Sequence, residues 1–429
     1  MPLIHCRKTR RQPGLSTLAP LAALAGIAAT VALAPCQPEG AHWPRFRGPE
    51  GSGIAPFSDL PLTWDAGTGE NIVWQAPLAL PGANSPIVWG RRLFVTGADE
   101  SRREVYCLDA QTGEALWTCP VPGTDEERPP PRIHGMTGYA APTAATDGER
   151  VYAVFPTGDL IALDLDGNAL WQRWFDMSED IYGHASSPVL WGDLLFLQID
   201  LGKPDIGLSH LVALSRETGE TVWDIPRPVQ GSWTTPIVIT AGGREELVTS
   251  AKPWVIAYDP ATGEEYWRVR CVEGDSAPSP IYAGGRVLVA NIYASLVAII
   301  PGGEGDVTDS HVAWSSRGSL PDICSPLSDG ELVFVLSTGG VLSCYDAGDG
   351  AVLWSENLGR RFRSSPSLVG ERVYLLSEAG DSVVVAARRE YRELGTGRLG
   401  EPVYSSPAFA WRKMYVRGEG HLFCIGSDR

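Results

Sequence analysis

Short apolar segments alternate with Gly-containing turns along most of the chain. From residue 86 onward the segments come in groups: a small residue and a proline, three apolar segments separated by turns, and a fourth segment that carries a tryptophan. Short apolar segments bounded by turn residues predict β-strands, because helices need longer stretches with a 3.6-residue period. The pattern therefore predicts an all-β protein of consecutive antiparallel strands.

The group of segments recurs eight times, each time opening on a proline that lies 40 to 56 residues from the next. Repeats of about 40–50 residues with four strands are typical of the blades of a β-propeller. The opening prolines are Pro86, Pro142, Pro188, Pro236, Pro280, Pro326, Pro366 and Pro407. We therefore predict an eight-bladed β-propeller of four-stranded antiparallel blades.

A turn of fixed spacing closes most repeats, as in Asp109, Gly113 and Trp117. The Asp carboxylate can accept backbone N–H groups two residues on, and Gly readily takes a positive φ. The large Trp ring can cover the seam to the next blade, while its N–H bonds a neighbouring carbonyl. We expect this structural role for Trp74, Trp117, Trp171, Trp223, Trp267, Trp314 and Trp354.

The last repeat, from Pro407, leaves room for only three strands before the chain ends. A further copy of the closing turn, between Asp65 and Trp74, lies near the other end of the sequence. We expect a strand over residues 71–78 to complete the last blade, because this pairing removes an open sheet edge that would favour aggregation. The propeller is then expected to span residues 63–429.

The segment ahead of the propeller, residues 36–62, is polar and rich in proline and glycine. Such a composition disfavours a regular element. We expect this N-terminal extension to pack on the propeller, with Trp43 and Phe46 as its anchors.

Residues 1–35 have the composition of an export signal. A basic cluster at residues 7–11 precedes an uncharged apolar stretch at residues 15–34. Three outcomes stay open: cleavage after Ala34, lipidation of Cys36, or an uncleaved membrane anchor, since about 20 apolar residues can span a bilayer. We expect an exported protein of the periplasm or cell envelope, with membrane attachment through the N-terminus among the alternatives.

Charge and cysteine spacing exclude several classes of protein. The formal net charge is −16, which would repel a polyanion, so no nucleic-acid partner is expected. The eight cysteines include no Cys-x-x-Cys pair, so a zinc ribbon or a thioredoxin-like site is unsupported. We expect a monomer.

The closing turn resembles the tryptophan-docking motif of the pyrroloquinoline-quinone-type repeat, which occurs in quinoprotein alcohol dehydrogenase-like propellers. Its clearest copies here are residues 108–117 and 258–267. The opening segment 43–53 resembles the start of exported propeller proteins of planctomycete type, described as similar to the outer-membrane protein assembly lipoprotein. The resemblance covers residues 43–429 and implies the fold much more specifically than the function.

Function in a propeller gathers where loops lead into the innermost strands, at the mouth of the central channel. His134 and His184 lie in such segments, each close to a glycine and an aromatic residue. The alternative interpretation is that loop His and Ser side chains only satisfy backbone groups. The candidate ligand-binding residues of the mouth are His134, Tyr139, His184, Asp200, Trp233, Lys252 and Arg361.

No catalytic residue follows from these segments. His134, His184 and Asp200 are donors of the kind that zinc accepts, but the sequence does not favour a metal site over satisfied loop residues. Ser186 and Ser187 adjoin His184, yet the same Ser-Ser-Pro triplet recurs before two later blades, so it belongs to the repeat.

We therefore predict a non-catalytic scaffold that binds a protein, peptide or small ligand at the channel mouth, with an envelope protein or peptide as its partner. The alternative, implied by the resemblance, is a quinone-dependent dehydrogenase. Such enzymes carry a vicinal cysteine pair over the quinone, which this sequence lacks. Bound pyrroloquinoline quinone is accordingly not expected, although enzymatic activity stays an open question.

Overall fold

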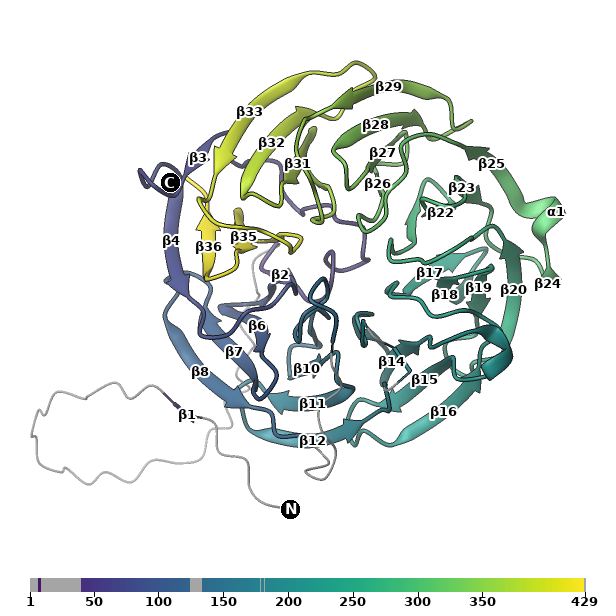
Figure 1. The fold of residues 1–429 in the computed structure, drawn as a ribbon, viewed down its shortest axis with the longest axis horizontal. Coiled ribbons are helices and arrows are strands. Elements are labelled where there is room, and N and C mark those ends of the chain that lie inside the picture. Colours follow the sequence, from purple (N-terminus) through teal and green to yellow (C-terminus); the bar gives the residue numbers. More distant parts are fainter. Residues whose placement is uncertain (1–6, 9–39, 124–132, 178, 181, 428–429) are drawn as a thin grey trace, which may run out of the picture.

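The computed structural model describes residues 7–8, 40–123, 133–177, 179–180 and 182–427. Eight sheets stand around a central channel, and the chain runs through them in sequence order (Figure 1). The predicted cleavage site and Cys36 lie outside the described residues. Within the described ranges, no helix has the length and apolar character needed to cross a membrane.

The first four blades are antiparallel sheets numbered from the inner strand outward. The first two consist of β5 (Ile87–Trp89), β6 (Arg92–Ala98), β7 (Arg103–Asp109) and β8 (Ala115–Pro120), then β9 (Ala145–Thr146), β10 (Arg150–Val154), β11 (Asp159–Asp164) and β12 (Ala169–Trp174). The next two consist of β13 (Val189–Trp191), β14 (Leu194–Ile199), β15 (His210–Ser215) and β16 (Thr221–Pro226), then β17 (Ile237–Ala241), β18 (Arg244–Ala251), β19 (Trp254–Tyr258) and β20 (Glu265–Arg270).

The other four blades repeat this arrangement. The fifth and sixth consist of β21 (Ile281–Ala283), β22 (Arg286–Ala290), β23 (Leu296–Ile299) and β25 (Val312–Ser316), then β26 (Leu327–Ser328), β27 (Leu332–Leu336), β28 (Val341–Asp346) and β29 (Val352–Asn357). The last two consist of β30 (Ser367–Val369), β31 (Arg372–Leu376), β32 (Asp381–Ala386) and β33 (Glu393–Arg398), then β34 (Ala408–Ala410), β35 (Lys413–Arg417), β36 (His421–Ile425) and β4 (Ile72–Pro77).

Few elements lie outside this scheme. Short strands β1 (Arg7–Lys8) and β2 (His42–Trp43) join the first sheet, β3 (Trp64–Asp65) joins the seventh, and β24 (Gly305–Asp306) joins the fourth. The helical turns are η1 (Pro204–Ile206) and α1 (Thr308–His311). The predicted all-β propeller of eight four-stranded blades is confirmed.

The ring closes through the N-terminal strand. β4 pairs antiparallel with β36, so that Trp74 lies opposite Cys424, and it supplies the fourth strand of the last blade. The predicted closure is confirmed. The two ends of the propeller therefore share one sheet, and opening the ring requires the loss of an entire strand pairing.

On the outer side of the ring, five of the seven docking tryptophans rest on the glycine of the next blade's closing turn. A Cβ on Gly167 would lie 2.7 Å from the Trp117 ring, and the Trp117 indole N–H donates to the carbonyl of Leu165 at 3.0 Å. The glycine therefore provides both a positive φ and a flat surface for the indole. The same contact joins Trp74 to Gly113, Trp171 to Gly219, Trp223 to Gly263 and Trp314 to Gly350.

Two docking tryptophans depart from the pattern. The next blade after Trp267 ends in an enlarged turn, and the Trp267 indole N–H donates instead to Glu246 of its own blade at 2.8 Å. Trp354 faces a turn without glycine, remains half-buried and donates to the carbonyl of Arg388 at 3.0 Å. The predicted docking position is kept in both, but the partner differs because the neighbouring turn differs.

The seventh blade has no Trp in its outer strand, and the N-terminal segment fills the gap. β3 pairs in parallel with β33, which places Trp64 opposite Gly397. The ring of Trp64 stacks on Tyr374 with centroids 6.2 Å apart, and a Cβ at Gly397 would lie 2.3 Å from the indole. A residue from the other end of the chain therefore covers this outer strand.

The N-terminal extension enters the channel. Trp43 is fully buried in β2, which pairs with β5. The buried guanidinium of Arg45 donates to the carbonyl of Pro236, and that of Arg47 to the carbonyls of Pro326 and Pro366. Burial lowers the pKa of both arginines to about 10, so both stay cationic at neutral pH. The extension is thus tied to blades on several sides of the channel.

Removing an indole should cost most where the ring is most buried. We expect Trp267→Ala to lower the free energy of unfolding by about 3–5 kcal/mol, the usual range for a buried aromatic side chain. Trp354→Ala serves as the matched comparison and should cost less than half as much, because its ring is partly exposed. Urea unfolding followed by circular dichroism measures both; a larger loss for Trp354 would contradict this account of blade docking.

Candidate functional site

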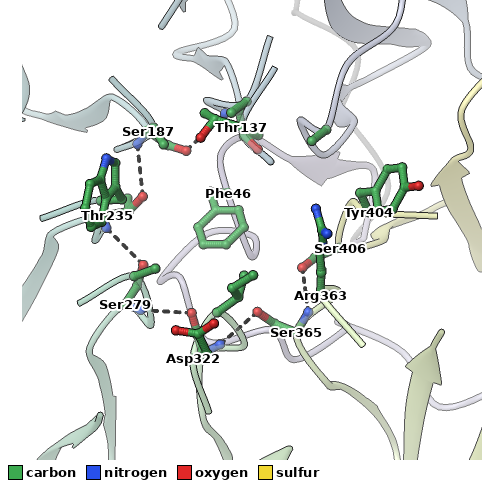
Figure 2. A pocket seen from close by; sticks show the side chains of 18 of the residues that line it. Phe46, Thr137, Ser187, Thr235, Ser279, Asp322, Arg363, Ser365, Tyr404 and Ser406 are labelled. Atoms are coloured by element: carbon green, nitrogen blue, oxygen red, sulfur yellow. Dashed lines mark hydrogen bonds between the residues drawn. The ribbon is translucent and has the colours of Figure 1, made fainter. Parts of the chain in front are cut away.

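A closed circle of hydrogen bonds surrounds the channel at the start of the innermost strands. In each blade, one Ser or Thr donates its backbone N–H to the side-chain hydroxyl of the equivalent residue in the next blade, at 2.9–3.1 Å. Figure 2 shows several of these bonds around Phe46. The hydroxyl ring consists of Ser85, Thr143, Ser187, Thr235, Ser279, Ser325, Ser365 and Ser406.

The ring explains the small residue that precedes the opening proline of the repeat. In seven blades the ring residue stands directly before proline, whose ring holds the preceding residue in an extended conformation. In the second blade the order is reversed, because Thr143 follows Pro142. The recurring Ser-Ser-Pro triplet is therefore a structural feature of the seams, as its recurrence in the sequence indicates.

Above the ring lies a cavity of about 410 Å³ that opens at one face of the propeller. Phe46, from the N-terminal extension, points into it and is surrounded by the ring hydroxyls (Figure 2). Aromatic side chains from four blade-opening or hairpin loops line its wall: Tyr182, Trp233, Tyr293 and Tyr404. The charged side chains of the lining are Asp275, Asp322 and Arg363.

One wall of the cavity is held rigid by aromatic and carboxylate contacts. Tyr182 meets the edge of Trp233 with ring centroids 5.1 Å apart. The Trp233 indole N–H donates to the Asp180 carboxylate at 3.0 Å. Burial raises the pKa of Asp180, and the nearby charge of Asp275 raises it further. This wall therefore has an amphipathic surface with negative charge behind it.

The opposite wall centres on Arg363. Its guanidinium forms an ion pair with Glu378 at 3.1 Å and lies over the Tyr404 ring, 5.1 Å from the centroid. One nitrogen also donates to the carbonyl of Met136 at 3.4 Å, which links the seventh blade to the loop before the second. The positive charge of Arg363 is thus already paired within the protein.

The structure brings only some of the predicted site residues together. Trp233 lines the central cavity. His134 and Tyr139 line an adjoining cavity of about 710 Å³, which shares Met136 and Thr137 of their loop with the first, and His134 packs on Tyr182 with centroids 4.9 Å apart. These three residues therefore line cavities at the channel opening.

His184 and Asp200 lie elsewhere, and their predicted position at the mouth is corrected. His184 is almost completely buried, and desolvation lowers its pKa to about 4, so it is neutral at physiological pH. Asp200 is fully buried in an ion pair with Arg227 and accepts a hydrogen bond from Ser232 at 2.6 Å. A buried charge needs such a partner, which is why Asp200 belongs to the blade interior.

Lys252 and Arg361 are not in the lining of either cavity. Lys252 makes a long ion pair with Glu273, at 3.7 Å, and Arg361 approaches Glu378 at 3.6 Å. The mouth instead uses Arg363, two residues further along. Asp275, Tyr293 and Asp322 were missed, since no repeat position distinguishes them.

The metal site that His134, His184 and Asp200 could have formed is absent from this arrangement. In the part of the chain that the structure describes, no three His, Cys, Asp or Glu side chains come close enough to hold a metal ion. His134, His184 and Asp200 instead take part in separate hydrogen bonds and packing contacts.

The fold and the mouth define this protein as an eight-bladed β-propeller with a polar, aromatic-walled channel opening. The chain belongs to the family described as outer membrane protein assembly factor BamB, whose family model matches residues 59–198, 208–323 and 306–394. A similar curated protein is the outer membrane protein assembly factor BamB of Burkholderia pseudomallei (strain K96243), 24% identical over 71% of this chain and 74% of that protein.

Other similarities are partial or concern the fold alone. Quinoprotein ethanol dehydrogenase of Pseudomonas putida is 30% identical over 31% of this chain, but this match spans only 21% of the enzyme. The crystal structure of BamB from Moraxella catarrhalis has a TM-score of 0.61 and 14% identity, covering 83% of this chain and 99% of that one. Quinohemoprotein alcohol dehydrogenase from Comamonas testosteroni has a TM-score of 0.67 and 14% identity, covering 92% and 82%.

Neighbouring serines allow a direct test of the hydroxyl ring. Ser365→Ala leaves the buried N–H of Ser325 without its acceptor, which should cost about 1–3 kcal/mol of unfolding free energy. Ser364 is equally buried, but its hydroxyl has no partner among the described residues, so Ser364→Ala should be close to neutral. Thermal and urea unfolding compare the two; equal effects would show that the ring bond adds nothing to stability.

Proposed function

We propose that this protein is an exported, non-catalytic scaffold of the cell envelope that holds a segment of a partner protein at the channel mouth during outer membrane protein assembly. The family and its relatives support the general role, because they carry the name of outer membrane protein assembly factors. Export and envelope location rest on the N-terminal signal composition. The mouth is the part of the molecule suited to contact a partner.

The observation that carries the proposal is the exposure of apolar side chains at this opening. Met136, Ile292 and Tyr293 are 46%, 46% and 61% exposed. Met136 and Tyr293 line the central cavity, and Ile292 directly precedes Tyr293 in the same loop. Large apolar side chains grouped on a surface beside a concave site favour protein contact, because their burial by a partner removes apolar area from water.

The lining supports a scaffold better than a quinone-dependent dehydrogenase. Pyrroloquinoline quinone carries three carboxylates and would need several cationic donors. The cavity offers one guanidinium, Arg363, which already pairs with Glu378, and two carboxylates, Asp275 and Asp322. Phe46 also projects into the cavity among the ring hydroxyls. The residues present do not fit a tricarboxylate.

Site-specific photo-cross-linking in cells tests this proposal. A benzoylphenylalanine at position 292 or 293 should give a defined adduct with an envelope protein, because both positions lie on the mouth. The matched control is position 352 on the outer strand β29, where Val352 is similarly exposed, at 49%. Adducts at the control alone, or equal adducts at all three positions, would contradict binding at the mouth.

A further inference from the structure

The central cavity is lined by two carboxylates that have no ion-pair partner. Of its three charged lining residues, Arg363 pairs with Glu378, while Asp275 and Asp322 have no cationic partner among the described residues. Asp275 receives a single hydrogen bond from the Gln230 amide, at 3.2 Å. Asp322 makes no hydrogen bond or ion pair within the described part of the chain, and Figure 2 places it among the residues around Phe46.

The aromatic wall adds a preference for one kind of cation. Tyr182 and Trp233 lie on the same wall as Asp275, and the ring of Tyr293 is largely exposed at the rim. The faces of Tyr and Trp attract ammonium and guanidinium groups, and more so when water is partly excluded. The site already contains one such contact, between Arg363 and Tyr404. A long cationic side chain would therefore be held by both ring faces and carboxylates.

The hydroxyl ring provides a second, independent indication of a ligand. All eight ring side chains are more than nine-tenths buried and line this cavity. Each hydroxyl oxygen accepts a backbone N–H, and within the described part of the chain none of these hydroxyls donates a hydrogen bond of its own. Buried donors normally find acceptors. Carbonyl oxygens of an inserted polypeptide, or ordered water, would satisfy them.

We propose that the partner segment held at the mouth inserts a lysine or arginine side chain toward Asp275 and Asp322. Tyr182, Trp233 and Tyr293 flank the cation, and the segment's backbone carbonyls approach the ring hydroxyls. This inference rests on the proposed role of the mouth as a protein-binding site. The acidic surface of the whole chain adds long-range attraction for a basic segment.

Isothermal titration calorimetry with short peptides tests the charge preference. The probes are acetyl-Gly-Ser-Lys-Ser-Gly-amide, its Gln and Glu counterparts, and butylamine, each added to the purified full chain. The Lys peptide should bind at least about tenfold more tightly than the Gln peptide, and its affinity should fall as salt rises. Equal binding of the Gln or Glu peptide, or no binding of the Lys peptide, would overturn the inference. Equally tight binding of butylamine would assign the site to small amines and overturn the peptide proposal.

Three variants locate the cation. Asp322→Asn and Asp275→Asn should each weaken Lys-peptide binding by about fivefold or more, and Tyr293→Ala by a comparable factor. Asp193→Asn makes the same charge change at a fully exposed carboxylate, paired with Arg216, and should leave binding unchanged. Melting temperatures equal to that of the wild type confirm folding. If Asp193→Asn weakens binding as much as Asp322→Asn, the net charge of the protein alone explains the affinity. The proposed position of the cation would then be wrong.

The two proposals can fail separately. Cross-links at positions 292 and 293 without any preference for the Lys peptide would retain the scaffold and overturn the cationic segment. Selective Lys-peptide binding that depends on Asp322, without cross-links in cells, would retain the site chemistry and overturn the scaffold role.

Discussion

Eight hydrogen bonds between a backbone N–H and a hydroxyl join the innermost strands into one continuous circle. Each bond spans the seam between two blades, so every blade both donates and accepts one such bond. A blade therefore cannot move at this point without moving its neighbours. The donors are buried, and a buried N–H without an acceptor is costly. The circle therefore sets the width of the channel and, with it, the size of the cavity above.

The rest of the structure extends this constraint outward and along the channel. At the periphery, indole rings rest on bare glycines of the next blade, which repeats the seam contact at a larger radius. Segments from the N-terminus complete what the repeats leave open: β4 closes the ring, Trp64 covers the seventh blade, and Arg45 and Arg47 bind carbonyls inside the channel. Phe46 is thereby placed at the centre of the hydroxyl ring.

The sequence was sufficient for the fold because the repeat constrains it eight times over. The Pro positions gave the blade count, and the copy of the closing turn before Trp74 gave the closure. The Ser-Ser-Pro triplets were recognised as part of the repeat, although the hydrogen bonds that require them depend on neighbouring blades and could not be derived from spacing alone.

The site was less predictable, because it consists of residues that interrupt the repeat. Arg361 and Arg363 are separated by one residue, yet only Arg363 lines the cavity. Asp200 was predicted to lie at the mouth, but pairing with Arg227, 27 residues away in the sequence, holds Asp200 in the interior. Trp233 and the loop of His134, which directly precede blades, do line the two cavities. The rotation of each blade decides which loop residue points inward. The period of the repeat does not predict this rotation.

Amide hydrogen exchange of the eight ring residues, resolved to single positions, tests the central role of the circle most directly. If the circle holds the blades together, these amides should exchange as slowly as those of the central strands and at similar rates to one another, because each opens only with the whole ring. Exchange as fast as in the surface loops, or protection confined to a few seams, would contradict this account.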